Sequence, residues 1–189
     1  MRLNRALAAG LLLPALAFGV VACGDDGEDP GSADTSTGAA PAGGTVTLYS
    51  SLPLQGAQRP QTTDLVNGIK LALKQAANKA GPFTVKYVSK DDSSAQAGTW
   101  TAENVSANAR AAAQDETTAV YIGEFNSGAS AISIPILSDA KVPQISPANT
   151  AVGLTSDEPG AEPGTPAKYY PSGFRNYTCL LYTSPSPRD

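Results

Sequence analysis

The chain has 189 residues, of which 41% are hydrophobic, enough for one globular domain with a packed core. Its formal net charge is -4 and its basic residues are scattered singly. We therefore expect no nucleic-acid partner, because the phosphate backbone requires clustered Lys and Arg. The chain contains no histidine, which removes the commonest general base and the commonest metal ligand. Its two cysteines, Cys23 and Cys179, are not expected to form a disulfide.

The first 22 residues have the three-part pattern of an export signal. Arg2 and Arg5 give a positive start, and residues 6–21 form an apolar run. This run is shorter than the roughly 20 apolar residues of a membrane-spanning helix. A buried core helix is the alternative, but the polar residues 24–29 follow with no second apolar face to pack. We therefore expect residues 1–22 to be a cleaved signal peptide.

The residues Val20-Val21-Ala22-Cys23 resemble a bacterial lipobox, with valine where leucine is typical. The resemblance implies cleavage before Cys23 and attachment of lipid to its sulfur. The protein would then be lipid-anchored on the outer face of the cytoplasmic membrane or in the periplasm; plain secretion is the alternative. Residues 23–44 are rich in Gly, Ser, Thr, Ala, Pro and Asp and cannot bury enough apolar surface to fold. We expect them to form a disordered linker that acts as a tether.

The end of the sequence, residues 179–189, reads CLLYTSPSPRD and has neither a helical nor a strand period. It matches, residue for residue, the translation of a transposase-type sequencing adapter. A genuine Pro/Ser-rich tail is the alternative. We expect residues 179–189 to be an adapter-derived artefact and the natural sequence to stop near Thr178.

Short β-branched strands alternate with helical patterns over residues 45–146. The first helical pattern has apolar residues at spacings of three and four, a start capped at Thr62, Thr63 or Asp64, and an end at Gly81. Pro135 lies inside the third pattern and predicts a kink, or a helix that begins near Ser133. The expected strands cover residues 45–50, 83–89, 119–122 and 142–146, and the other expected helices cover residues 101–114 and 128–140.

This alternation predicts an α/β fold with a doubly wound parallel sheet. In such sheets a ligand binds beyond the carboxyl ends of the strands. Four loops are expected to lie together at that edge: residues 50–61, 90–99, 123–127 and 146–150.

Four stretches of this region resemble the leucine/isoleucine/valine-type (type I) periplasmic binding proteins of ABC importers. They are LYSSLPLQG, DLVNGIKLALKQAANKAG, VKYVSKDD and YIGEFNSGASAISIPILSDAKVPQISPANTAVGLT, in this order. The resemblance implies two lobes that close on a solute, of which residues 45–178 form the N-terminal part of the first. It implies delivery of an amino acid or a similar small solute to ABC permease subunits. A ligand-sensing receptor or regulator of the same fold is the alternative, because fold does not determine function.

The segment Asn126-Ser127-Gly128 joins an expected strand to an expected helix. A helix start binds a carboxylate through its free N–H groups and its dipole, although ordinary helix capping would also explain these residues. The resemblance implies that this loop and the loop after the next strand grip the main-chain charges of an amino acid. The ligand-binding residues it implies are Asn126, Ser127, Gly128, Ala148 and Thr150, with Glu124 and Phe125 on the same rim.

The remaining candidates are weaker. Asp91-Asp92 could form a metal pair, but a solvated turn is expected there, so we expect no metal site. Tyr169-Tyr170-Pro171 is expected to be a surface loop, with a role at the ligand cleft as the alternative. No G-x-G-x-x-G segment follows a strand, there is no Walker loop, and no histidine is present to activate a serine. We therefore expect no enzyme activity, no catalytic residue and no cofactor.

Overall fold

The computed structural model describes residues 43–180. The expected signal peptide, Cys23 and most of the expected linker lie outside the described residues, as do residues 181–189. Within residues 43–180, no helix has both the length and the apolar character needed to cross a membrane.

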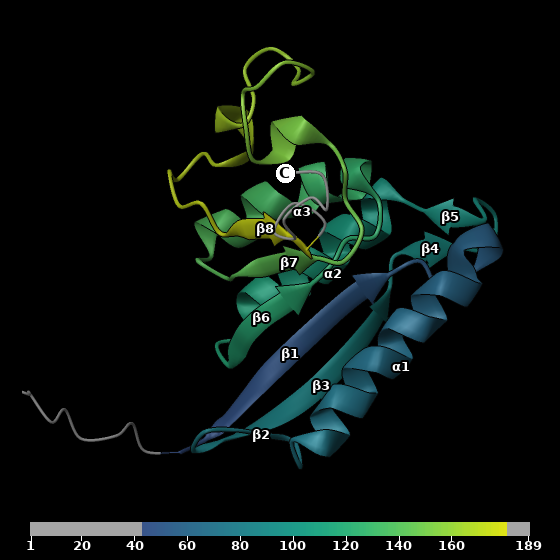
Figure 1. Ribbon diagram of the computed structural model, residues 1–189, viewed down its shortest axis with the longest axis vertical. Helices are drawn as coiled ribbons and strands as arrows, with labels where there is room; N and C mark the ends of the chain where they lie inside the picture. Colours follow the sequence, from purple (N-terminus) through teal and green to yellow (C-terminus); the bar gives the residue numbers. More distant parts are fainter. Residues whose placement is uncertain (1–42, 181–189) are drawn as a thin grey trace, which may run out of the picture. The chain divides into compact units, whose positions relative to one another are not determined.

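The described part of the chain is built around a six-stranded sheet in the order β2-β3-β1-β6-β7-β8 (Figure 1). All neighbouring strands pair in parallel except the short edge strand β2, which runs antiparallel to β3. A separate hairpin of two short strands follows β3. The main strands are β1 (Thr45–Leu52), β2 (Lys79–Ala80), β3 (Phe83–Asp91), β6 (Thr118–Ile122), β7 (Gln144–Ser146) and β8 (Tyr177–Cys179), and the hairpin is β4 (Ser93–Ser94) with β5 (Thr99–Trp100).

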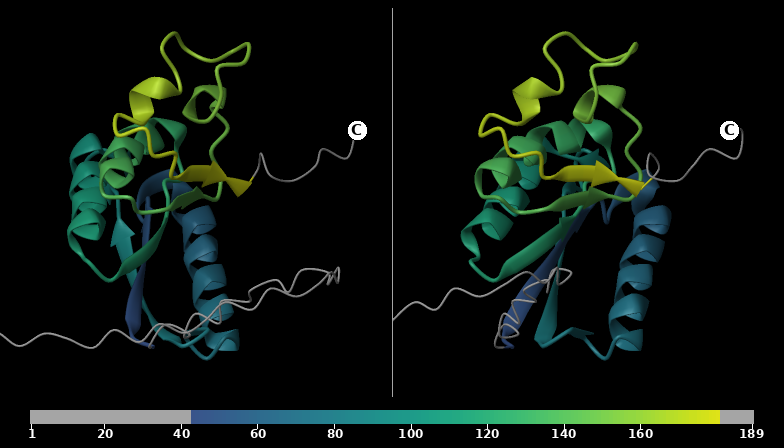
Figure 2. Two further views of the ribbon diagram at one scale, coloured as in Figure 1. Left: turned by 90° about the vertical axis from the view of Figure 1, so that its left-hand side faces the viewer. Right: turned by 60° about the vertical axis from the view of Figure 1, so that its left-hand side comes forward.

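Helices cover both faces of this sheet, as Figure 2 shows. Helix α1 (Arg59–Gln75) lies on one face, and α2 (Ala102–Gln114) and α3 (Ser127–Asp139) lie together on the other. The chain thus winds outward from β1 in both directions, so the topological switch point lies between β1 and β6. The predicted doubly wound α/β fold is confirmed. Three short 3-10 helices lie in the loops: η1 (Gly56–Gln58), η2 (Val152–Leu154) and η3 (Ala167–Tyr169).

Helix α1 differs from the prediction at both ends. It begins at Arg59, with Pro60 in its first turn, where the N–H that proline lacks would have no helical acceptor. Thr62, an expected cap, is fully buried instead and donates a hydrogen bond to Pro53 O at 2.6 Å. The helix ends at Gln75 because Ala77 and Asn78 adopt left-handed backbone angles, with φ of 50° and 52°.

The other two helices follow the prediction more closely. Thr101 caps α2, its hydroxyl accepting the N–H of Asn104 at 3.2 Å. Helix α3 runs from Ser127 through Pro135, so the alternative start near Ser133 is wrong. Burial explains this tolerance of an interior proline, because Ala129, Ile134 and Leu137 are all completely buried and pack the helix along most of its length.

Two hydrophobic clusters hold these elements. The first lies between the sheet and the pair α2 and α3, where alanines on α2 let it approach closely; it contains Tyr49, Ala109, Ala112, Tyr121, Leu137 and Val142. The second lies under the segment that joins β7 to β8 and contains Ile134, Leu154, Tyr170, Tyr177 and Cys179. The expectation of a surface loop at Tyr170 is therefore wrong: its ring is buried and its hydroxyl donates to Leu154 O at 2.7 Å.

Cys179 ends β8 and is buried, and its thiol donates to Asn149 O at 2.8 Å. That residues 179–189 derive from adapter sequence stays a prediction. On the opposite face of the sheet, α1 turns part of its apolar side toward an open groove of about 570 Å³. The apolar residues of this groove are Leu65, Ile69, Ala72, Ile122, Ile145, Pro147 and Leu180.

Candidate ligand-binding site

The loops at the carboxyl ends of the parallel strands meet, as predicted. The loop after β1 is tied to the end of β3, because Leu54 N donates to Asp91 Oδ1 at 2.9 Å. The loop after β6 is tied to the loop after β7, because Ser127 Oγ accepts the N–H of Thr150 at 3.2 Å. These contacts join the four loops in two pairs at the edge of the sheet beside the switch point.

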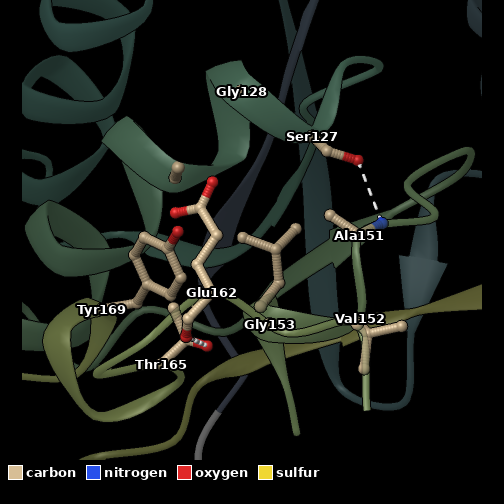
Figure 3. Close-up of a pocket in the computed structure, with 11 residues that line it drawn as sticks. Ser127, Gly128, Ala151, Val152, Gly153, Glu162, Thr165 and Tyr169 are labelled. Atoms are coloured by element: carbon tan, nitrogen blue, oxygen red, sulfur yellow. Dashed lines mark hydrogen bonds between the residues drawn. The ribbon is translucent and has the colours of Figure 1, made fainter. Parts of the chain in front are cut away.

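The start of α3 has no side-chain cap. Asn126 occupies the N-cap position without a capping hydrogen bond, and the first turn contains no acidic residue. The hydroxyl of Ser127 is used elsewhere, since it accepts the N–H groups of Thr150 and of Ala151, the latter at 3.3 Å (Figure 3). The first turn of α3 thus supplies no negative group to the positive end of the helix dipole.

Gly128 lets a neighbour in space approach the first turn of α3 closely. A Cβ atom placed on Gly128 would lie 3.1 Å from Cζ2 of Trp100, closer than ordinary packing allows. Trp100 is the chain's one tryptophan and stands on β5, a strand that the sequence analysis did not predict. Its indole therefore packs directly against the first turn of α3.

A cavity of about 370 Å³ opens beside the start of α3. Ser127, Gly128 and Ala131 form the wall on α3, and residues 151–154 form a second wall. The third wall comes from the long segment before β8, and its lining residues are Gly160, Glu162, Thr165 and Tyr169. Figure 3 shows the carboxyl group of Glu162 beside Tyr169, reaching toward α3. Glu162 also forms an ion pair with Lys168 at 3.0 Å.

The structure brings together only some of the predicted site residues. Ser127 and Gly128 line the cavity, and Thr150 adjoins it through the hydrogen bond of its N–H to Ser127. Asn126 and Ala148 do not line it; the N–H of Ala148 turns to Ser146 Oγ at 3.2 Å. Tyr169 lines the cavity, in line with the alternative of a role at the cleft. Glu162 and Thr165 were missed, because a Gly- and Pro-rich run has no periodicity that would place it over α3.

Asn149, which the sequence analysis did not single out, joins the two ligand loops, that is, the loop after β6 and the loop after β7. It is 2% exposed, and its Nδ2 donates to Phe125 O at 3.0 Å and to Glu124 O at 3.2 Å. Its Oδ1 accepts the hydroxyl of Tyr177 at 2.7 Å. One amide side chain thus connects the loop after β6, the loop after β7 and strand β8.

Two acidic side chains near these loops are buried, contrary to expectation. Glu124 was expected on the rim and Asp92 in a solvated turn, but both are 0% exposed. Asp91 takes the turn-forming role instead, since its carboxylate accepts from Leu54 N, from Gln55 Nε2 at 2.8 Å and from Ser93. Among the described residues, no three metal-binding side chains lie together.

The environment sets the protonation of these acids. Burial raises the pKa of Asp92 to about 6, and nearby Asp91 adds to the rise. Burial also raises the pKa of Glu124 well above its ordinary value, as does its contact with Asp92. For Asp91, burial opposes ionisation, but hydrogen bonds from Ser93, Leu54 and Gln55 together lower its pKa.

The described residues have the fold of a lobe of type I periplasmic binding proteins. Among its solved neighbours is the branched-chain amino acid substrate-binding protein LivJ of Streptococcus pneumoniae in complex with isoleucine. That structure has a TM-score of 0.53 and 19% identity, over 71% of this chain and 33% of its own.

Two further neighbours have similar scores. A solute-binding protein from Rhodopseudomonas palustris BisB5, in complex with 3,4-dihydroxybenzoic acid, has a TM-score of 0.53 and 22% identity, over 62% of this chain and 31% of its own. The leucine-binding protein LivK of Thermotoga maritima has a TM-score of 0.51 and 24% identity, over 61% of this chain and 31% of its own.

These likenesses define the fold of the chain. The chain spans about a third of the length of these neighbours, which are themselves binding proteins. No protein-family model matches the sequence, and no curated protein matches it.

Proposed function

We propose that this chain is part of an extracytoplasmic solute-binding lipoprotein that delivers an amino acid or a similar small solute to an ABC transporter. The observation that carries the proposal is the uncapped start of α3, which opens into a cavity of about 370 Å³. A helix start of this kind favours a negatively charged group, and a carboxylate is the negative group of an amino acid.

The hydrogen bonds of Ser127 support the same chemistry. Its oxygen already accepts two backbone N–H groups, so its own hydroxyl hydrogen remains for donation to a further acceptor. In the proposed complex that acceptor is the solute carboxylate, which also receives N–H groups of the first turn of α3. We propose no catalytic residue, because binding and orienting a carboxylate needs no proton transfer.

The partners follow from this assignment. A lipid on Cys23 would hold the protein at the outer face of the cytoplasmic membrane, and ABC permease subunits would receive the solute. The neighbours in complex with isoleucine and with 3,4-dihydroxybenzoic acid support a small carboxylate as the solute class.

Amide shifts in a nuclear magnetic resonance titration test the proposal. Leucine should shift the amides of Ser127 and Gly128, with weak affinity because one lobe makes the contacts, whereas leucinamide should not shift them. Ser127→Ala should weaken binding of leucine by about tenfold, the cost of one hydrogen bond to a charged group. Ser106→Ala, on α2 and outside the cavity, is the control. Equal shifts with leucine and leucinamide would refute carboxylate recognition.

A further inference from the structure

Two carboxyl groups lie buried beneath the loops after β6 and β7, and no basic side chain within residues 43–180 pairs with them. Asp92 and Glu124 are each 0% exposed and lie within hydrogen-bonding reach of each other. The hydroxyl of Tyr121 donates to Glu124 Oε1 at 2.8 Å, and the hydroxyl of Ser51 lies near the same carboxyl group. No basic side chain among the described residues forms an ion pair with either carboxyl group.

The groups around the pair offer no positive charge. From β3 the neighbour is Asp91, from β6 the hydroxyl of Tyr121, and from β1 the hydroxyl of Ser51. On the helix side, Asn108 of α2 donates to Ser51 Oγ at 3.1 Å, and Ser130 of α3 accepts the N–H of Glu124. Two ionised carboxylates in such a place would repel each other, and burial would make each charge costly.

We propose that Asp92 and Glu124 share one proton, and that this shared proton positions the loops after β3, β6 and β7 for ligand binding. One carboxyl group donates its hydrogen to the other, so a single hydrogen bond replaces the repulsion between two charges. The positioning part rests on the proposed function, whereas the sharing of the proton does not.

The backbone of Glu124 transmits its position to both ligand loops. Its carbonyl oxygen accepts the hydroxyl of Ser146 at 2.8 Å and the amide of Asn149 at 3.2 Å. Its N–H donates to Ser130 Oγ at 3.2 Å, which fixes it to the first turns of α3. If the pair separated, the start of α3 and the loop after β7 would move with Glu124.

The pH dependence has a definite sign. Burial raises the pKa of both acids in the folded state, so between their unfolded and folded pKa values the folded chain binds more protons. The contribution of the pair to stability is therefore fully present below about pH 4, and it is lost as the pH rises through about 6, the pKa of Asp92, and further until Glu124 is ionised. Each proton held only by the folded chain changes the unfolding constant by about tenfold per pH unit.

Urea unfolding of the full chain at a series of pH values, followed by the fluorescence of Trp100, tests the shared proton. The unfolding constant of the wild type should rise with pH above about pH 4, by up to about tenfold per unit for each proton. Glu124→Gln and Asp92→Asn should flatten this rise, because an amide donates a hydrogen bond without a titrating proton. Glu116→Gln, at an exposed acid, should keep the wild-type slope. A wild-type slope in both variants of the pair would overturn the proposal.

Infrared spectroscopy keeps the test decisive if a variant folds poorly. The native wild type at pH 7 should show the carbonyl stretch of a protonated carboxylic acid, which is absent from Glu124→Gln. Absence of this band from the wild type would overturn the proposal. Loss of the band when Na⁺ or Ca²⁺ is added would also overturn it, because the pair would then be a cation site.

The leucine titration repeated at two pH values separates this inference from the proposed function. The shifts at Ser127 should show affinity falling from pH 6 to pH 8.5 in the wild type but not in Glu124→Gln. A pH-independent wild-type affinity would overturn the positioning role. Absence of binding at every pH, together with the expected unfolding profile, would refute the proposed function and leave the shared proton supported.

Discussion

Replacement of Asn149 by alanine is expected to destabilise the described fold strongly. Asn149→Ala removes two donations, to Phe125 O and Glu124 O, and one acceptance, from Tyr177. These groups lie in or beside a buried region, so water cannot replace the lost partners freely. At about 1 kcal/mol for each lost hydrogen bond, the free energy of unfolding should fall by about 3 kcal/mol.

A double-mutant cycle isolates one of these bonds. Tyr177→Phe keeps the buried ring and removes only the hydroxyl that donates to Asn149 Oδ1 at 2.7 Å, so it should cost about 1 kcal/mol. The double variant Asn149→Ala/Tyr177→Phe loses this bond only once. Its loss of unfolding free energy should therefore be about 1 kcal/mol smaller than the sum of the losses in the two single variants.

Urea unfolding followed by the fluorescence of Trp100 measures these free energies. For a domain of this size, a loss of about 3 kcal/mol moves the midpoint down by about 1 to 2 M urea. Asn126→Ala is the matched control, because Asn126 makes no capping hydrogen bond and its Oδ1 has no partner among the described residues; its midpoint should move much less. Equal shifts for Asn149→Ala and Asn126→Ala, or additive costs in the cycle, would show that Asn149 does not hold the loops together.

Two further predictions concern the loop after β1, and the same urea assay measures both. Gly56→Ala should cost about 3 kcal/mol or more, because φ is 74° and the new Cβ would lie 1.8 Å from Gly98 O. Gly98→Ala, with φ of 62° but open space around it, should cost only about 1 kcal/mol, and equal costs would contradict the close approach of Gly56 to Gly98. Thr62→Val should cost about 1 to 3 kcal/mol, because it leaves the buried Pro53 carbonyl without its donor at 2.6 Å. Thr63→Val, at an exposed position of the same helix, should be nearly neutral, and an equal loss there would point to helix propensity instead.

Local patterns were enough to predict most of the elements. Hydrophobic periodicity found β1, β3, β6 and all three long helices. The expected helix over residues 101–114 begins one residue before α2, at its cap Thr101. The start of α1 was misplaced because Pro60 suits both a loop and the first turn of a helix, and only packing of the chain around it decides between them. The strands β2, β4, β5 and β8 were missed because two or three residues carry no measurable period.

The candidate site, like the fold, could be predicted from the sequence only in part. The sequence by itself determined that Ser127 and Gly128 begin a helix after a strand, and that such a start at the edge of a parallel sheet favours a negative group. The tertiary structure decided what surrounds that start: Trp100 against Gly128, the wall of Glu162 and Tyr169, and the amide of Asn149 between the loops. It also decided that Asp92 and Glu124 are buried side by side. Burial and contact between distant segments depend on how the whole chain packs, so no local pattern of residue types records them.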